Sequence, residues 1–283
     1  MVSRDQNGAS YTIFSVRTLP LLPIFPGRRA SLYPIHSFED IDSRPVKSKI
    51  TMFLQSALPI LAAVGTAFAA AIPTQTPNEN HLARRAVSGQ STFYGGNVQG
   101  GTCSFSTYKI PSGLYGTAFS GQAWDNAANC GGCVKVTHGG KSITAMIVDK
   151  CPECDEGHLD LFSDAFAALA NPSDGIIDTS YEFVSCPKVS GPLTIHTKSG
   201  VSPYWISAQV VNANRRTSKL EVSTDGNSWT EAKRTEYNFF EISSGVGADS
   251  ASIRVTSEDG ASVVVRDVPM KADVSTDASG NYK

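Results

Sequence analysis

The sequence predicts an all-β protein of two domains, a small closed β-barrel followed by a β-sandwich. Short β-branched and aromatic runs separated by glycine turns fill residues 88–187, the expected barrel. Pro187-Lys-Val-Ser-Gly-Pro192 has the composition of a linker. Beyond it, Asp225-Gly226 and Asp259-Gly260 lie between alternating apolar runs, a pattern typical of β-hairpins. We therefore assign residues 190–275 to the sandwich.

The chain's ends carry no pattern of a packed domain. Residues 1–51 hold scattered Pro, Arg and Ser, and we interpret them as a non-structural extension, with a disordered arm as the alternative. Residues 52–71 form an Ala-rich apolar run that predicts a cleaved signal peptide rather than a membrane anchor. Residues 72–85 are polar and end in Arg-Arg, as a pro-segment or linker does. We expect a secreted protein of the extracellular space or cell wall, without membrane attachment after cleavage, and a C-terminal tail over 276–283.

Charge argues against one class of partner. Residues 86–187 hold 4 basic and 10 acidic residues, and residues 188–283 hold 11 of each. This distribution offers no basic patch for a phosphate backbone, so we expect no nucleic acid. We expect the mature protein to be a monomer.

Six cysteines form one block and have two chemical interpretations. Cys130-x-x-Cys133 and Cys151-x-x-Cys154 lie 17 residues apart, a spacing that fits a four-thiolate zinc site. The even count and the secretory leader instead favour three disulfides, and we expect no metal and no cofactor. Six cysteines allow about 15 pairings, among which spacing does not choose.

Two aspartates flank the Cys151–Cys154 loop. Asp149 follows an apolar β-branched run over 142–148, and Asp160 precedes Ser163, which has the character of a helix N-cap. Residues at such junctions often present polar groups to a ligand. The alternative is that both aspartates are turn or capping residues.

Aromatic side chains in the second domain suggest a binding face. In an expected strand over 204–210, alternation places Trp205 with Ser207 and Gln209 on the polar face. Outward aromatic rings usually bind something, and flat rings suit the apolar faces of sugars. The alternative is that these rings are covered by the other domain or by a loop. We expect Trp229 to have a packing role.

Several motifs together resemble those of a known family. They are Thr92-Phe-Tyr-Gly-Gly, Asn129-Cys-Gly-Gly-Cys, Val148-Asp-Lys-Cys-Pro-x-Cys and His158-Leu-Asp-Leu. Over about residues 88–275 the chain resembles the expansins, most closely microbial expansin-like proteins and fungal loosenins. The resemblance implies a six-stranded double-psi β-barrel, related to glycoside hydrolase family 45. It also implies that an immunoglobulin-like β-sandwich follows as a carbohydrate-binding module.

The resemblance also assigns roles. Asp160 matches the family's essential aspartate, and Asp149, Thr92 and Tyr94 match residues of its glycan-binding groove. Further implied features are a platform of Tyr204, Trp205 and Tyr237 and the disulfides Cys103–Cys130, Cys133–Cys186 and Cys151–Cys154. The chain departs from the pattern at Cys151, where bacterial relatives have a groove tyrosine, and at Tyr204, where tryptophan is common.

The sequence lacks the carboxylate expected to act as the base in glycosidic bond hydrolysis. Glycoside hydrolysis normally uses two carboxyl groups across the bond. In the related hydrolases the base follows the first-strand tyrosine, but after Tyr94 no carboxylate occurs before Asp125. We therefore predict a protein that binds insoluble polysaccharide, cellulose or another wall glycan, and loosens it without hydrolysis. The alternatives are a hydrolase or lytic transglycosylase with Asp160 as acid, and a glycan-binding or host-interaction protein with an inert groove.

Overall fold

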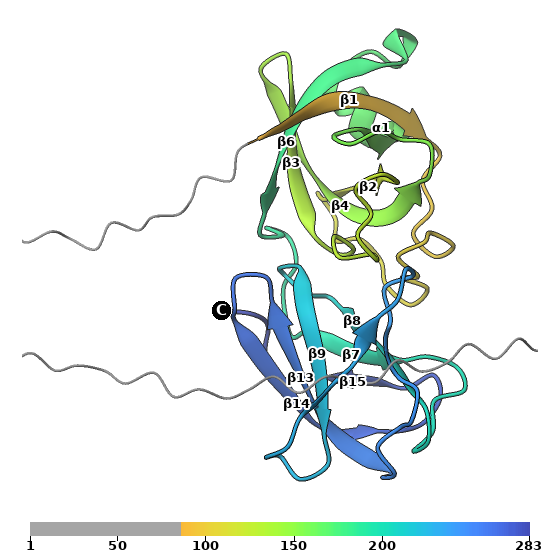
Figure 1. Ribbon diagram of the computed structural model, residues 1–283. Coiled ribbons are helices and arrows are strands. Elements are labelled where there is room, and N and C mark those ends of the chain that lie inside the picture. The colour runs from red at the N-terminus through yellow and green to blue at the C-terminus, as the bar shows by residue number, and fades with distance from the viewer. Residues whose placement is uncertain (1–85) are drawn as a thin grey trace, which may run out of the picture. The chain divides into compact units, whose positions relative to one another are not determined.

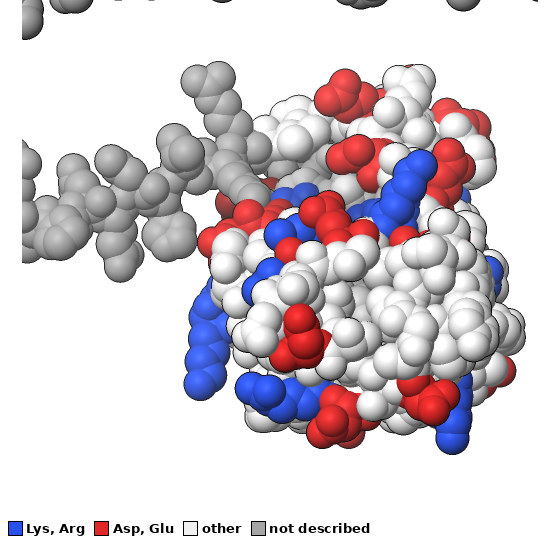
Figure 2. Space-filling model, turned by 60° about the horizontal axis from the view of Figure 1, so that its bottom comes forward, with Lys and Arg blue, Asp and Glu red and all other residues white. Residues whose placement is uncertain are grey.

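The computed structural model describes residues 86–283 as an all-β protein with a closed barrel and a two-sheet sandwich (Figure 1). The expected extension, signal peptide and pro-segment, 1–51, 52–71 and 72–85, lie outside the described residues. Between residues 86 and 283, the structure contains no helix with the length and apolar character needed to cross a bilayer. On the face that Figure 2 shows, acidic and basic side chains are interspersed rather than gathered by sign.

The barrel has the six strands that the family resemblance implies, and their order is β1-β5-β2-β4-β3-β6. Two pairs are parallel, β1 with β5 and β2 with β4, and the others are antiparallel. A short helix, α1 (Ser163–Leu169), and a 3-10 helix, η1 (Pro172–Asp174), precede the last strand. The strands are β1 (Val87–Tyr94), β2 (Tyr115–Ser120), β3 (Cys133–His138), β4 (Lys141–Cys151), β5 (Leu159–Phe162) and β6 (Ile177–Val184).

Local chemistry explains the barrel's tightest turn. β3 and β4 form the predicted hairpin, with His138 opposite Lys141. Gly139 and Gly140 connect them with φ of 53° and 80°, values that favour glycine in a two-residue hairpin turn. Inside the barrel, aliphatic and aromatic side chains from the strands and α1 form one core, with Val134, Val136, Ile147, Leu159, Leu161 and Phe166 fully buried.

Three disulfides connect the barrel's segments. Cys103 bonds to Cys130, Cys133 to Cys186 and Cys151 to Cys154, the pairings that the family resemblance implies. All six cysteines are therefore oxidised, and the four-thiolate zinc interpretation is wrong. The Cys151–Cys154 bond closes the short loop between the strands that carry the two aspartates.

The sandwich consists of a four-stranded sheet, β10-β9-β13-β14, and a five-stranded sheet, β11-β12-β8-β7-β15. Asp259 and Gly260 lie in the predicted hairpin turn between β13 and β14, whereas Asp225 and Gly226 lie in the longer connection from β9 to β10. The strands are β7 (Thr194–Thr197), β8 (Ile206–Val211), β9 (Thr217–Ser223), β10 (Thr230–Glu231), β11 (Lys233–Arg234), β12 (Phe240–Ile242), β13 (Ser250–Ser257), β14 (Ser262–Pro269) and β15 (Ser275–Asp277).

The sequence predicts a tail over 276–283, and this prediction is wrong, because these residues belong to the sandwich. β15 pairs with β7. Tyr282 is only 3% exposed within the sandwich core, and its hydroxyl lies 2.8 Å from Thr217 Oγ1. The short polar strand and the lone tyrosine give no periodic apolar pattern from which this packing could be predicted.

This correction predicts a large effect at the C-terminus. Tyr282→Ala should lower the free energy of unfolding by about 3–5 kcal/mol, the usual cost of deleting a buried aromatic ring. Denaturant unfolding of the purified protein measures it. Lys283→Ala, at the exposed neighbouring position, is the control. Equal stability of both variants and the parent would show that the C-terminus is a tail after all.

Candidate functional site

Four side chains lie in a row across neighbouring strands of the barrel. In the strand register Thr92 of β1 is opposite Asp160 of β5, Asp160 is opposite Ala118 of β2, and Ala118 is opposite Asp149 of β4. Leu159 and Leu161 point into the core, so alternation directs Asp160 outward. Neighbouring strands lie about 4.8 Å apart, which places the two aspartate backbones about 10 Å apart. We call the polar members of this row, Thr92, Asp160 and Asp149, together with their hydrogen-bonded neighbours Tyr94 and His158, the polar row.

Asp160 is half-buried and bonded to a hydroxyl. Thr92 Oγ1 donates to Asp160 Oδ1 at 2.6 Å, and His158 Nε2 lies 3.0 Å from the same Thr92 oxygen. Burial raises the pKa of Asp160, while the Thr92 hydrogen bond and the charge of His158 act in the opposite direction. The carboxyl group therefore keeps its proton to a higher pH than an ordinary aspartate.

The structure corrects the interpretation of Asp160 as a helix-entry cap. Asp160 lies inside β5, and the N-cap of α1 is Phe162, which has no side-chain capping bond. Ser163, the expected cap, instead donates its hydroxyl to the carbonyl of Tyr94. The sequence signal was misleading because the helix begins directly from a strand.

Asp149 is held as an acceptor on both oxygens. Its Oδ1 accepts the backbone N–H of Thr102 at 2.7 Å and of Lys150 at 2.8 Å, and its Oδ2 accepts the Tyr94 hydroxyl at 3.2 Å. Burial, and then the charge of Asp149, raise the pKa of Tyr94 above its usual range, so its phenol remains a donor. A Cβ on Gly101 would lie 2.6 Å from the carbonyl oxygen of Val148, so glycine permits this close approach.

Two of the three predicted aromatic residues lie near one lysine of the sandwich. Lys198 Nζ lies 4.6 Å from the ring centroid of Tyr237 and 6.0 Å from that of Trp205, so these two rings are neighbours. Tyr204, beside Trp205 in the chain, is 77% exposed. We call Tyr204, Trp205 and Tyr237 the aromatic platform. Trp229 lies against the guanidinium of Arg254, which is 4.3 Å from its ring centroid, and it is not part of the sandwich core.

The predicted strand over 204–210 begins later, at Ile206, so Tyr204 and Trp205 lie in the preceding turn. Ser207 and Gln209, expected on an exposed polar face, are fully buried. Gln209 Nε2 donates to the carbonyl of Cys103 in the barrel at 2.9 Å. The barrel therefore helps to cover Gln209, whereas the Tyr204 ring, for which coverage was the alternative, is exposed.

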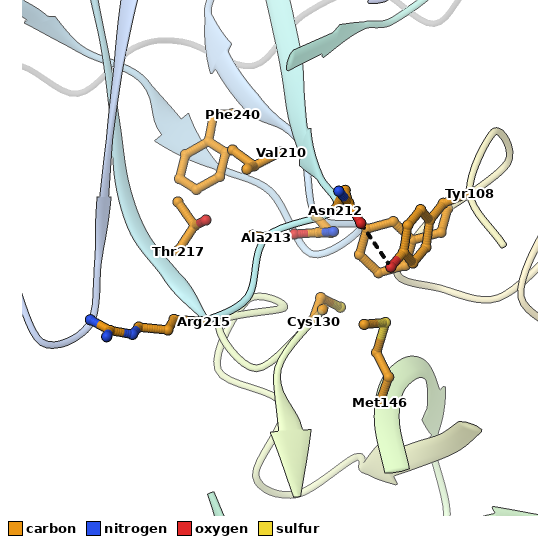
Figure 3. A pocket seen from close by; sticks show the side chains of 12 residues that line it. Tyr108, Cys130, Met146, Val210, Asn212, Ala213, Arg215, Thr217 and Phe240 are labelled. Atoms are coloured by element: carbon orange, nitrogen blue, oxygen red, sulfur yellow. Dashed lines mark hydrogen bonds between the residues drawn. The ribbon is translucent and has the colours of Figure 1, made fainter. Parts of the chain in front are cut away.

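A small pocket lined by barrel and sandwich residues lacks the groups expected of a catalytic site. Tyr108 and Asn212 form a hydrogen bond of 3.4 Å at its edge (Figure 3). Its lining contains no carboxylate, and the side chain of Arg215 bonds to Asp259. The pocket is therefore part of the packing between the two domains. Within residues 86–283, no group of three His, Cys, Asp or Glu side chains is placed to hold a metal ion.

His158 is the member of the polar row that sequence reasoning missed. Its position two residues before Asp160 places both side chains on one face of an extended segment, which was the available signal. The backbone N–H of Thr102 was also missed, because a main-chain donor leaves no trace in residue type.

Comparisons with known proteins agree with this architecture. Residues 91–181, which span most of the barrel, match the sequence model of the family described as lytic transglycolase. "Expansin-like protein 1" of Dictyostelium discoideum is 29% identical over 185 residues, covering 62% of this chain and 64% of that protein. The solved expansin of Clavibacter michiganensis, described for one variant in complex with cellohexaose, is 28% identical with a TM-score of 0.64. That match covers 70% of this chain and 98% of the solved chain.

"Expansin-YoaJ" of Bacillus subtilis is 31% identical to this chain over 172 residues. The aligned region covers 59% of this chain and 72% of the Bacillus protein, so it includes residues of both domains. The double-psi barrel, the sandwich and these sequence matches lead to one conclusion: the chain belongs to the expansin family.

Proposed function

We propose that this protein binds insoluble cell-wall polysaccharide and loosens the non-covalent contacts between glycan chains without cutting them. The observation that carries the proposal is the unequal state of the two aspartates. Asp160 has one hydrogen bond from Thr92, whereas Asp149 is occupied by three donors. The cellohexaose complex of the Clavibacter michiganensis expansin, which shares the fold, supports a β-linked glucan as one ligand class.

Loosening follows from competition for hydrogen bonds. An ionised Asp160 accepts sugar hydroxyls through charge-assisted bonds, which are about twice as strong as neutral ones. A sugar hydroxyl that donates to Asp160 no longer donates to the neighbouring glycan chain. The aromatic platform holds the polymer by stacking on sugar faces, so the sandwich supplies most of the affinity and the polar row supplies the disruption.

Hydrolysis would need a second carboxyl group to activate water. Asp149 is poorly suited to this, because three of the about four lone-pair sites of its carboxylate already accept hydrogen bonds from Thr102, Lys150 and Tyr94. It also lies on the same row as Asp160, two strands away, rather than on a facing wall. We infer that Asp149 orders this row and binds sugar as a fixed anion.

Two observations favour a second candidate, cleavage by a single acid. Burial raises the pKa of Asp160, which suits a proton donor, and the barrel matches a family described as lytic transglycolase. A lytic reaction needs no water-activating base and would leave an anhydro-sugar end. A glycan-binding protein with an inert polar row is the remaining alternative, and it would bind polymer without weakening it.

We place the action outside the cell, on its wall. Three disulfides persist in oxidising compartments, and the Ala-rich run over 52–71 has the composition of a secretory signal. One chain carries both the polar row and the aromatic platform, so the proposal involves a monomer without metal or cofactor.

The platform assignment predicts a loss of affinity. Trp205→Ala should weaken binding to insoluble cellulose by about 1–3 kcal/mol, the scale of one aromatic stacking partner in nucleic-acid platforms. Binding isotherms on washed polymer measure this loss. Trp229→Ala is the matched control, since that ring packs on Arg254. Equal affinity of Trp205→Ala and the parent for cellulose and chitin would remove the platform from the proposal.

Substitution of the central carboxylate separates function from fold. Asp160→Asn should abolish the weakening of filter paper while binding to polymer persists, because the platform is unchanged. The thermal midpoint at pH 7 should not fall, since the variant no longer buries a charge. Asp164→Asn, at an exposed position on α1, is the control and should weaken paper normally. Normal weakening by a stable Asp160→Asn protein would leave Asp160 without a functional role.

The raised pKa of Asp160 predicts a pH profile with a defined sign. Burial favours the protonated form, so the ionised fraction grows only as pH rises through a value above the ordinary 3.8. Loosening should therefore increase with pH across that titration. The stabilising effect of the raised pKa is fully present below the unfolded-state value and is lost as pH rises through the folded-state value. Loosening that instead declines as Asp160 ionises would favour the single-acid candidate.

A further inference from the structure

Two facing glycines bring His158 against the first strand. A Cβ on Gly89 would lie 2.2 Å from the carbonyl oxygen of Gly157, and one on Gly157 would lie 2.6 Å from that of Ser88. Gly157 also has φ of 85°, which side chains with a Cβ rarely adopt. The turn before β5 can therefore approach β1 closely enough for the imidazole to reach Thr92.

The direction of the hydrogen bonds follows from counting protons. Thr92 has a single hydroxyl proton, which it donates to Asp160 Oδ1 at 2.6 Å. At 3.0 Å from the same oxygen, His158 Nε2 can bond only as a donor while Asp160 is ionised. The chain therefore runs from His158 through Thr92 to Asp160.

We propose that His158 is a positioning residue of this site: its Nε2–H orients the Thr92 hydroxyl so that the hydroxyl proton is held by one oxygen of Asp160 and the other oxygen remains free for glycan. The inference rests on the proposed function for its consequence, but the orientation itself is a property of the protein alone.

A purely structural role for the imidazole is less well supported. The turn at this point is closed by the backbone, where His158 N donates to the carbonyl of Asp155 at 3.0 Å. The imidazole is partly exposed and is not a member of the barrel core. Its hydrogen bond to Thr92 is therefore the contact through which it can act.

The charged groups around Asp160 set the background for a test. His158 lowers its pKa, whereas Glu153 and Asp149 raise it by repulsion. Asp160 in turn contributes to the raised pKa of Tyr94. Because His158 acts on Asp160 both by charge and by orienting Thr92, the experiment compares two uncharged replacements.

The test uses His158→Gln and His158→Phe, each made with Thr92 present and with Thr92→Val. The Gln amide places an N–H near the position of Nε2, and the Phe ring keeps the shape without a donor. Paper weakening by His158→Phe should fall roughly tenfold, near the upper end of what one hydrogen bond contributes. His158→Gln should recover most of it. With Val at position 92, the Gln and Phe proteins should be indistinguishable.

A second measurement does not require loosening. The ¹³C carboxyl resonance of Asp160, followed against pH, should give titration midpoints that rise in the order parent, Gln, Phe. His158→Leu replaces Phe if that protein unfolds, and polymer binding confirms an intact sandwich. If the parent fails to weaken paper, the proposed function falls while the titration still decides on His158. Equal Asp160 titration midpoints in His158→Gln and His158→Phe with Thr92 present would overturn the proposal. A difference between these midpoints that persists when Thr92 is replaced by Val would also overturn it.

Discussion

The hydrogen bond from Thr92 to Asp160 is the contact on which the site depends. It joins residues 68 positions apart in the chain, and it forms because β1 pairs in parallel with β5 in the register that places them side by side. A shift by one residue would turn Asp160 into the barrel core, where an unpaired carboxylate is costly. The buried leucines on either side of Asp160 hold this register.

The barrel gives its two aspartates different environments. Asp149 lies on a strand whose neighbouring loop supplies a backbone donor, and the Cys151–Cys154 bond closes the chain just beyond it. Asp160 is half-buried and accepts a hydrogen bond from Thr92 alone, so its charge is less well compensated. An anion that is incompletely satisfied by the protein gains most from sugar hydroxyls, which is why we assign the disruptive role to Asp160 and an ordering role to Asp149.

Much of the fold could be predicted from local patterns. The β3–β4 hairpin and the β13–β14 hairpin follow from glycine turns between alternating runs. β2 could not be predicted, because almost all of its residues are buried and alternation disappears. β15 was missed because it is short and polar, and the burial of Gln209 depends on the barrel, which no pattern within the sandwich encodes.

The site was predicted in part. The identities of Thr92, Tyr94, Asp149 and Asp160 came from family motifs, but their connections came from strand register. The hydrogen bond between His158 and Thr92 is known only from the structure. The same is true of the hydrogen bond from the backbone N–H of Thr102 to Asp149. Residue type shows that Asp149 can accept hydrogen bonds or a proton. Only the structure shows that its carboxylate already accepts three hydrogen bonds from the protein.

The central claim is that this surface disrupts glycan contacts without breaking glycosidic bonds. The most direct measurement follows filter-paper strength together with reducing ends and anhydro-sugars in the same samples, for the parent and for Asp160→Asn. We expect weakening by the parent without any rise in either product, and no weakening by the variant. The contradicting result is that the parent releases reducing ends or anhydro-sugars in proportion to the loss of paper strength, and that Asp160→Asn abolishes both effects. That result would identify a glycan-cleaving enzyme.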